Sequence, residues 1–216
     1  MKDAGCPRSE IGVLALQGGV AEHTRMLESL GARARRVRRP EDLDGLDGLV
    51  LPGGESTTID RLTRLFGLRD PLIDFARSGH PVLGTCAGLI LLAREIQDPA
   101  PGQQSLGLLD VTVARNAFGP QTHSTETEIP WGTPSGGSGG SSAENRAGDV
   151  GGERAGTVRA AFIRAPEVTR CGPEVEVLAR YDGRVVGVQQ ANLLGISFHP
   201  ELTGDTTVHA ALLDLV

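Results

Sequence analysis

Three short apolar runs in the first half of the chain each end in a glycine-containing turn and then lead into a helix-like segment. The turns are Gln17-Gly18-Gly19, Pro52-Gly53-Gly54 and Gly84-Thr85-Cys86-Ala87-Gly88. Strands and helices that alternate over short connections are typical of a doubly wound sheet. Ligands bind such sheets outside the carboxyl ends of the strands, so we expect the three turns to line one site.

The pattern predicts an α/β fold in which a doubly wound, flavodoxin-like sheet, mixed but mostly parallel, is flanked by helices. Its predicted strands cover 11–16, 34–37, 46–51, 109–114, 160–163, 175–180, 185–189 and 194–198, and a further strand directly precedes the Cys86 turn. Its predicted helices cover 20–30, 59–66, 71–78, a run after Cys86 that reaches Ala93, and 209–216. Tyr181-Asp182-Gly183-Arg184 is typical of a hairpin turn.

The length of 216 residues predicts a single domain over 1–216. One segment, at about 133–156, is rich in glycine and serine and cannot bury apolar surface, so we expect a mobile loop there. The net charge of −6 and one arginine cluster at 33–39 do not favour nucleic-acid binding. No run approaches about 18 consecutive apolar residues, so no membrane span is expected. Three cysteines without metal-like spacing suggest free thiols, a cytoplasmic protein and no metal site.

Cys86 occupies the nucleophile position of a G-x-nucleophile-x-G pattern between a predicted strand and a predicted helix. This context is typical of a nucleophile elbow, a sharp turn that needs small residues where backbone segments come close. Backbone N–H groups and the helix dipole favour an anion there, and thus a thiolate. The alternative interpretation is a buried structural cysteine at a tight turn.

A cysteine nucleophile needs a base, and the base needs an orienting group. Pro200 disfavours a helical conformation at His199, and in an extended segment residues two apart face the same side. His199 and Glu201 can therefore face one site together, whereas a surface turn with a chance His-Pro-Glu is the alternative. We expect His23 and His209, on predicted helices, to be solvated or to serve packing.

These residues suggest acyl-transfer chemistry in which the Cys86 thiolate attacks an acyl carbon. His199 would shuttle protons, while Glu201 would fix the tautomer of His199 and support its imidazolium form. The tetrahedral oxyanion needs backbone donors. We expect Ala87 N–H, directly after the nucleophile, and the Gly53 turn at the end of a neighbouring strand to supply them.

Several longer segments resemble the class I (triad) glutamine amidotransferases and, more closely, the PdxT-type glutaminase subunits of pyridoxal 5'-phosphate synthase. They are Gly12-Val13-Leu14-Ala15-Leu16-Gln17-Gly18, Leu51-Pro52-Gly53-Gly54-Glu55-Ser56-Thr57-Thr58, the Cys86 turn, Arg115-Asn116-Ala117-Phe118-Gly119, Phe162-Ile163-Arg164-Ala165-Pro166 and Ser197-Phe198-His199-Pro200-Glu201-Leu202.

The resemblance implies hydrolysis of L-glutamine to L-glutamate and ammonia by a triad of Cys86, His199 and Glu201, without a cofactor. It implies that Gln17 helps to complete the oxyanion hole. It also implies that the substrate is held by Gly54, Glu55, Ser56, Arg115, Ile163 and Arg164. The implied partner is a (β/α)8-barrel synthase subunit (PdxS type) in a hetero-oligomeric complex, which receives the ammonia for pyridoxal 5'-phosphate synthesis.

Two other functions remain open from the residues alone. One is a stand-alone thiol amidohydrolase on the same fold, such as a γ-glutamyl hydrolase. The other is a catalytically silent paralogue that serves as a regulatory subunit. The complete set of Cys86, His199 and Glu201 disfavours the silent paralogue, which has no need of all three residues.

Overall fold

The computed structural model describes residues 8–118, 125–132 and 156–216, so nearly all of the glycine- and serine-rich segment 133–156 lies outside the described residues. The first half contains β1 (Glu10–Leu14), α1 (Val20–Ser29), β2 (Arg33–Val37), a 3-10 helix (Pro40–Leu43), β3 (Gly48–Leu51), α2 (Ser56–Leu65), α3 (Arg69–Arg77), β4 (Val82–Thr85), α4 (Ala87–Leu92) and β5 (Ala93–Gln97). The second half contains β6 (Leu109–Ala114), β7 (Thr125–Trp131), β8 (Gly156–Phe162), β9 (Glu167–Cys171), β10 (Glu176–Tyr181), β11 (Arg184–Gln190), β12 (Leu193–Ile196), α5 (Pro200–Thr203) and α6 (Thr207–Leu213).

Within the described residues, a ten-stranded sheet runs in the order β2-β1-β3-β4-β12-β11-β9-β6-β5, and β10 pairs with β11. The first five strands of this order are parallel. An order that places the second strand outside the first and then continues along the chain is that of flavodoxin-like sheets. The antiparallel pairs of β11 and β9 make the sheet mixed, which confirms the predicted fold class.

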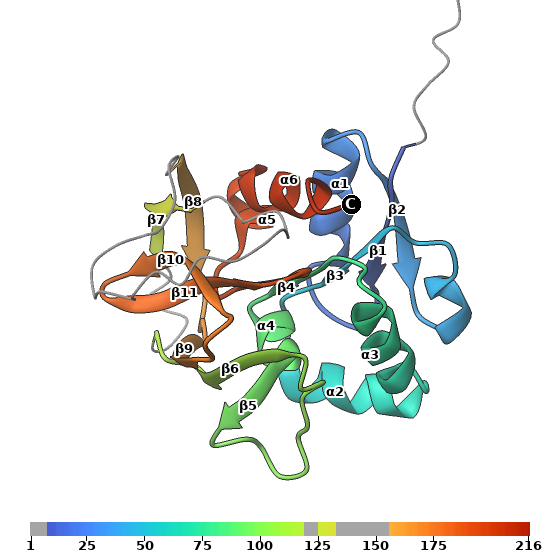
Figure 1. The fold of residues 1–216 in the computed structure, drawn as a ribbon, viewed down its shortest axis with the longest axis horizontal. Coiled ribbons are helices and arrows are strands. Elements are labelled where there is room, and N and C mark those ends of the chain that lie inside the picture. Colours follow the sequence, from blue (N-terminus) through green and yellow to red (C-terminus); the bar gives the residue numbers. More distant parts are fainter. Residues whose placement is uncertain (1–7, 119–124, 133–155) are drawn as a thin grey trace, which may run out of the picture.

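Helices cover both faces of the parallel strands. Figure 1 shows α1, α5 and α6 on one face and α2, α3 and α4 on the other. Neighbouring residues of β3 point into different cores: Leu49 and Leu51 pack with the α2–α4 side, whereas Val50 packs with the α1–α6 side. A strand buried on both faces needs apolar residues at every position, which explains why the sequence shows continuous apolar runs.

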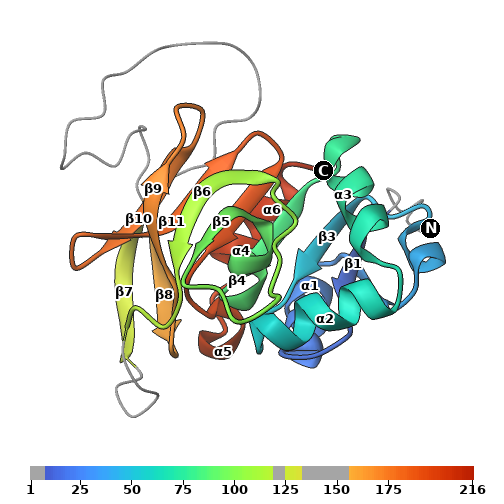
Figure 2. The same cartoon turned by 90° about the horizontal axis from the view of Figure 1, so that it is seen from below.

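The second half of the chain extends the sheet away from β1 and β3. Figure 2 shows β7, β8, β9, β10 and β11 gathered at the end opposite β1. The short pair of β7 and β8 adds Ile129, Trp131, Val158 and Phe162 to the core of the α1–α6 side. The hairpin turn predicted at 181–184 is confirmed, because Tyr181 pairs with Arg184.

Some elements differ from the sequence prediction. Helix α2 begins at Ser56 rather than at residue 59, because the Glu55 side chain accepts hydrogen bonds from the N–H groups of Thr57 and Thr58 and so caps the helix. The run after Cys86 is helical only to Leu92, and Ala93 already belongs to β5. Strands β5, β7 and β9 were not predicted.

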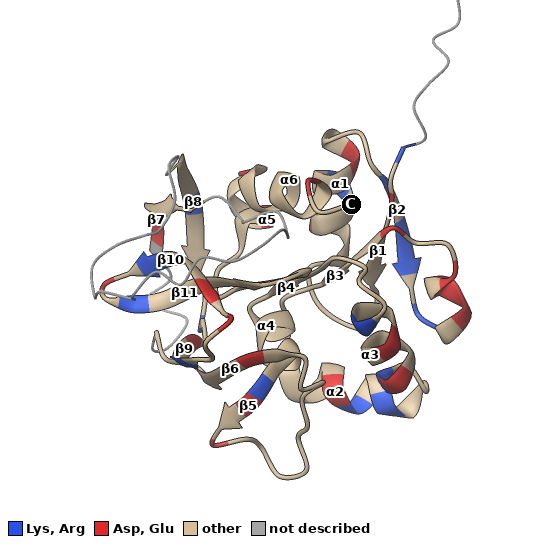
Figure 3. Cartoon of the chain, viewed as in Figure 1, with Lys and Arg blue, Asp and Glu red and all other residues tan. Residues whose placement is uncertain are grey.

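The arginine cluster lies around the edge strand β2 (Figure 3). Arg35 pairs with Glu10 at 2.9 Å, and Arg39 lies 3.8 Å from Glu41, so part of the cluster is neutralised by local acids. In the described part of the chain, no helix has the length and apolar character needed to cross a membrane.

Candidate active site

Cys86 lies at the turn between β4 and α4 with φ 49° and ψ −99°. Such a positive φ is unfavourable for a residue with a side chain and is found at strained functional turns. The Cys86 N–H donates to the carbonyl of Ile196 at the end of β12, which fixes the turn to the next strand of the sheet. Only 7% of Cys86 is exposed. The predicted elbow geometry is therefore present.

The two flanking glycines are required by close backbone contacts. A Cβ on Gly84 would lie 2.6 Å from the carbonyl group of Gly88. A Cβ on Gly88 would overlap the carbonyl oxygen of Leu51 at the end of β3. Side chains at either position would push α4 away from the strands, so the glycines allow the tight turn that presents Cys86.

His199 lies between β12 and α5, and its N–H donates to the carbonyl of Ala161 in β8 at 2.9 Å. Its Nδ1 lies 2.7 Å from Oε1 of Glu201, and its ring lies within interaction range of Cys86. Glu201 belongs to the first turn of α5, with His199 as the residue that precedes this helix. The predicted pairing of His199 and Glu201 is present, but it forms at a helix start rather than within an extended segment.

The surroundings of His199 favour its charged form. Burial alone would lower the pKa of His199, but hydrogen bonds to Cys86 and Glu201 and their negative charges raise it to about 10. Burial would likewise raise the pKa of Glu201, yet the bond from His199 and the interaction with His23 hold it below its ordinary value. The geometry therefore supports a charged imidazole beside the Cys86 sulfur, backed by the buried carboxylate of Glu201.

The turn after β3 packs directly against the imidazole ring. A Cβ on Gly53 would lie 3.0 Å from Nδ1 of His199 and would overlap Cε1. The carbonyl of Gly53 accepts from Gly19 N–H at 3.2 Å, so the turns after β1 and β3 are joined. The side chain of Gln17 accepts from the Glu55 N–H at 2.7 Å. The structure thus brings Gln17 and Gly53 to the Cys86 edge of the sheet.

Ala87 is the first residue of α4. At this position an N–H group has no acceptor within its own helix, so the N–H of Ala87 is available to an oxyanion beside the Cys86 thiol.

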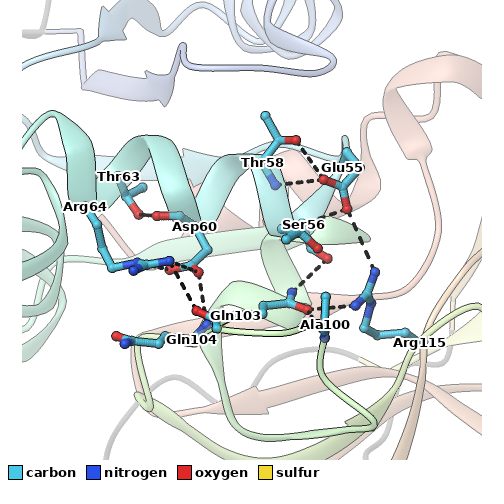
Figure 4. A network of polar contacts seen from close by, with 12 residues as sticks. Glu55, Ser56, Thr58, Asp60, Thr63, Arg64, Ala100, Gln103, Gln104 and Arg115 are labelled. Carbon is cyan, nitrogen blue, oxygen red and sulfur yellow. Dashed lines mark hydrogen bonds and ion pairs between the residues drawn. The ribbon is translucent and has the colours of Figure 1, made fainter.

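The expected substrate residues near α2 form a polar network with one residue that the sequence did not single out (Figure 4). Arg115 Nη1 donates to Oε1 of Gln103 at 2.7 Å, and Gln103 Nε2 donates to the Ser56 hydroxyl at 3.0 Å. The second guanidinium nitrogen, Nη2, lies 3.8 Å from Oε1 of Glu55. Gln103 lies in the connection between β5 and β6, where no sequence pattern marks it.

Glu55 and Gly54 lie at the exposed end of this network. The Glu55 side chain is 51% exposed although it also caps α2. Burial would raise its pKa, but hydrogen bonds from Thr58 and Thr57 lower it, so the carboxylate is negative. Glu55 therefore combines a structural role with an exposed negative charge.

Ile163 and Arg164 follow β8, close in sequence to Ala161, the backbone partner of His199. Arg164 is exposed and has a positive φ of 46°. The turn therefore follows directly on the strand whose Ala161 carbonyl holds the backbone of His199. Phe162, which precedes it, stacks on Phe118 from the segment after Arg115 with ring centroids 4.9 Å apart.

His23 and His209 differ from the expectation that they are solvated or only serve packing. Both are fully buried and hydrogen-bonded to each other, and His23 Nε2 lies 3.6 Å from Oε1 of Glu201. The spacing of Val20, His23 and Leu27 places His23 on the apolar face of α1, which was the signal for its burial.

Comparisons with known proteins identify the family of the chain. A sequence model of the SNO glutamine amidotransferase family matches residues 13–136 and 137–215. Pyridoxal 5'-phosphate synthase subunit PdxT of Corynebacterium glutamicum (strain R) is 51% identical over 209 residues, which cover 95% of each chain. The protein of the same name from Cutibacterium acnes is 52% identical over 210 residues, 94% of each chain.

A solved structure described as a glutamine amidotransferase has a TM-score of 0.80 and 42% sequence identity, and the match covers 95% of this chain and 97% of that one. The fold, the close relatives and a family match over nearly the whole sequence agree. The chain belongs to the SNO glutamine amidotransferase family.

Proposed function

We propose that Cys86, His199 and Glu201 are the catalytic triad with which the chain hydrolyses L-glutamine to L-glutamate and ammonia. The chain is a glutaminase subunit of pyridoxal 5'-phosphate synthase, since proteins of that name are 51% and 52% identical to it over nearly their whole length. The observation that carries the triad is that the strained Cys86 turn, the ring of His199 and the buried Glu201 lie in succession, with His199 hydrogen-bonded to Glu201 and acted on by Cys86.

In the first half of the reaction, the Cys86 thiolate attacks the side-chain amide carbon of glutamine and a C–S bond forms. The carbonyl π electrons move to oxygen, and the oxyanion is held by N–H groups. His199, as imidazolium, then donates a proton to the amide nitrogen. The C–N bond breaks, ammonia leaves, and a γ-glutamyl thioester remains on Cys86.

In the second half, the neutral His199 takes a proton from a water molecule, whose oxygen attacks the thioester carbon. The C–S bond breaks and its electrons return to sulfur, which restores the thiolate of Cys86 and the imidazolium of His199. Glu201 keeps Nδ1 protonated throughout, so that Nε2 faces the reacting atoms.

The oxyanion hole of this mechanism uses Ala87 N–H together with the turn of Gly53, with Gln17 supporting that turn. Two contacts favour this assignment: the Gln17 side chain binds Glu55 N–H, and Gly53 rests on the ring of His199. A backbone donor of this kind stabilises the transition state by roughly 3 kcal/mol.

The substrate's α-carboxylate suits Arg115, whose planar fork is already oriented by Gln103. Its α-ammonium suits the exposed carboxylate of Glu55, with Gly54 and Ser56 shaping the same turn. Ile163 and Arg164 would close the other side of the site, beyond β8. In this arrangement, positively charged Arg115 faces the substrate's α-carboxylate and negatively charged Glu55 faces its α-ammonium group.

The ammonia would pass to a (β/α)8-barrel synthase subunit of the PdxS type within a hetero-oligomeric complex. The relatives are named subunits of a synthase, which supports a partner. Direct transfer suits the product because free ammonia would be protonated and lost in bulk water.

Labelling with a glutamine-mimicking electrophile, diazo-oxo-norleucine, tests the nucleophile. We expect intact-mass analysis to show one adduct on the wild type and on Cys171→Ala, but none on Cys86→Ala. Cys171 is a matched control because it is a half-buried thiol at the end of β9. Equal labelling of Cys86→Ala would contradict the assignment. Glutaminase turnover should rise when the barrel subunit is added, and unchanged turnover would contradict the partner role.

A further inference from the structure

A buried pair of histidines lies directly behind the carboxylate of the triad. His23 and His209 are both 0% exposed, and Nδ1 of His23 lies 2.8 Å from Nε2 of His209. On its other side, His23 Nε2 lies 3.6 Å from Oε1 of Glu201, the same oxygen that His199 contacts at 2.7 Å. A polar path therefore runs from His199 through Glu201 and His23 to His209.

Thr85 ties this path to the nucleophile turn. Its hydroxyl lies 3.2 Å from Nε2 of His23, and Thr85 directly precedes Cys86 in the chain. Nε2 of His23 thus faces a hydroxyl and a carboxylate, both of which accept hydrogen bonds. A buried nitrogen in such surroundings is best satisfied when it carries the proton.

The surroundings at both ends of the histidine pair favour the same tautomer of His23. If Nε2 of His23 is protonated, its Nδ1 is an acceptor, and His209 must donate from its own Nε2. His209 Nδ1, which has no hydrogen-bond partner among the described residues, is then an unprotonated acceptor. In the reverse arrangement a lone pair of His23 would face the Glu201 carboxylate, and a buried N–H of His209 would lack an acceptor. The reverse is therefore disfavoured at both ends.

We propose that His23 is a positioning residue of the triad. Its Nε2–H, hydrogen-bonded to Thr85, turns its positive end toward Oε1 of Glu201 3.6 Å away and so helps to keep that oxygen in line with His199, while His209 fixes the tautomer of His23. This inference rests on the proposed function. Packing alone does not explain why two histidines are buried here, because two apolar side chains would fill the same space without the cost of desolvating four ring nitrogens.

Three variants separate a donor role from a space-filling role. His23→Leu removes the N–H, His23→Gln restores an amide N–H near the position of Nε2, and His80→Gln is a matched control. The side chain of His80 contacts the Ser78 hydroxyl and stacks on the ring of Phe75, and neither residue belongs to the proposed triad or the buried histidine pair. Each variant is assayed as a complex with the synthase subunit for glutaminase kcat and KM, and its thermal unfolding is followed.

We expect His23→Leu to lower kcat about tenfold, the effect of losing one contact to a charged group, while KM stays within twofold. His23→Gln should recover most of this loss, and His80→Gln should match the wild type. A folded His23→Leu with wild-type kcat, or a folded His23→Gln without recovery, would overturn the proposal. Glutaminase activity in Cys86→Ala would instead overturn the proposed function, which keeps the two failures distinct.

A second measurement does not depend on how the variants fold. Nitrogen NMR of the ¹⁵N-histidine-labelled wild-type protein reports which ring nitrogen carries the proton. We expect His23 and His209 to be protonated at Nε2 alone. A proton on Nδ1 of His23 would overturn the proposal even if every variant lost activity.

Discussion

Gly53→Ala tests whether the backbone after β3 positions the imidazole of His199 for its proposed catalytic role. The added methyl carbon would lie 3.0 Å from Nδ1 of His199 and would overlap Cε1, whereas relaxed contacts between such atoms need about 3.5–4.0 Å. The ring must therefore retreat by about 1 Å, which breaks its alignment with Glu201 and Cys86. A misplacement of about 1 Å can lower a rate by roughly 100-fold, or about 2.7 kcal/mol of activation free energy.

The assay measures glutaminase kcat of the complex with the synthase subunit, together with the free energy of unfolding. We expect kcat to fall about 100-fold in protein that remains folded, although overpacking costs about 1–3 kcal/mol of stability. Gly156→Ala and Gly19→Ala are controls with less crowding than Gly53→Ala. A Cβ on Gly156 meets nothing within 4 Å, and a Cβ on Gly19 would lie 3.4 Å from Oε1 of Glu201, an ordinary van der Waals contact. A folded Gly53→Ala with kcat within threefold of the wild type would refute the reasoning.

Three further predictions follow from the buried polar groups. Asp60→Asn should raise KM for glutamine more than it lowers kcat in steady-state assays. Asp60 accepts a hydrogen bond from Gln104 N–H at 3.0 Å and so holds the loop in which Gln103 orients Arg115 (Figure 4). Glu201→Gln should lower the pKa of the catalytic imidazole, followed by NMR titration, and lower kcat by roughly 10- to 100-fold, since a neutral amide stabilises the imidazolium less. Burial, and to a smaller extent the neighbouring His23, lower the pKa of His209 to about 3. Between pH 6.5 and 3 the unfolded chain therefore binds one more proton at this residue than the folded chain, so stability is lost as the pH falls. His209→Gln should remove one proton's slope, ~1.4 kcal/mol per pH unit, from urea unfolding measured across that range, and an unchanged slope would contradict the assignment.

The central strands of the parallel half could be predicted from the sequence because they are buried on both faces. Strands β3 and β12 are continuous apolar runs, β1 is apolar apart from Glu10 and β4 apart from Thr85, and such runs are visible without any partner. Strand β9 gives no such signal, since only Val168 of its five residues is buried. Strand β7 alternates threonine with glutamate and contains a proline, so its burial depends on pairing with β8.

In the candidate site, too, contacts between residues close in sequence could be predicted, whereas contacts between residues far apart in sequence could not. The Cys86 turn and the pair of His199 and Glu201 depend on residues close in sequence, so their geometry could be expected. The contact of His23 with His209 joins residues 186 positions apart, and the bond from Gln103 to Ser56 spans 47 positions. Neither pair has a spacing that a single sequence reveals, because the fold alone brings α1 next to α6 and the β5–β6 loop next to α2.

The contacts between the strand ends also determine how a disturbance at the surface reaches the triad. Gln17 is exposed and holds the turn after β3 through Glu55, whereas Gly53 in that turn is buried against the ring of His199. Gly19 N–H holds the carbonyl of the same glycine. Close-packed interiors transmit small shifts rather than absorb them. A contact that displaces residues 17–19 therefore displaces Gly53, and with it the surface on which the imidazole of His199 rests.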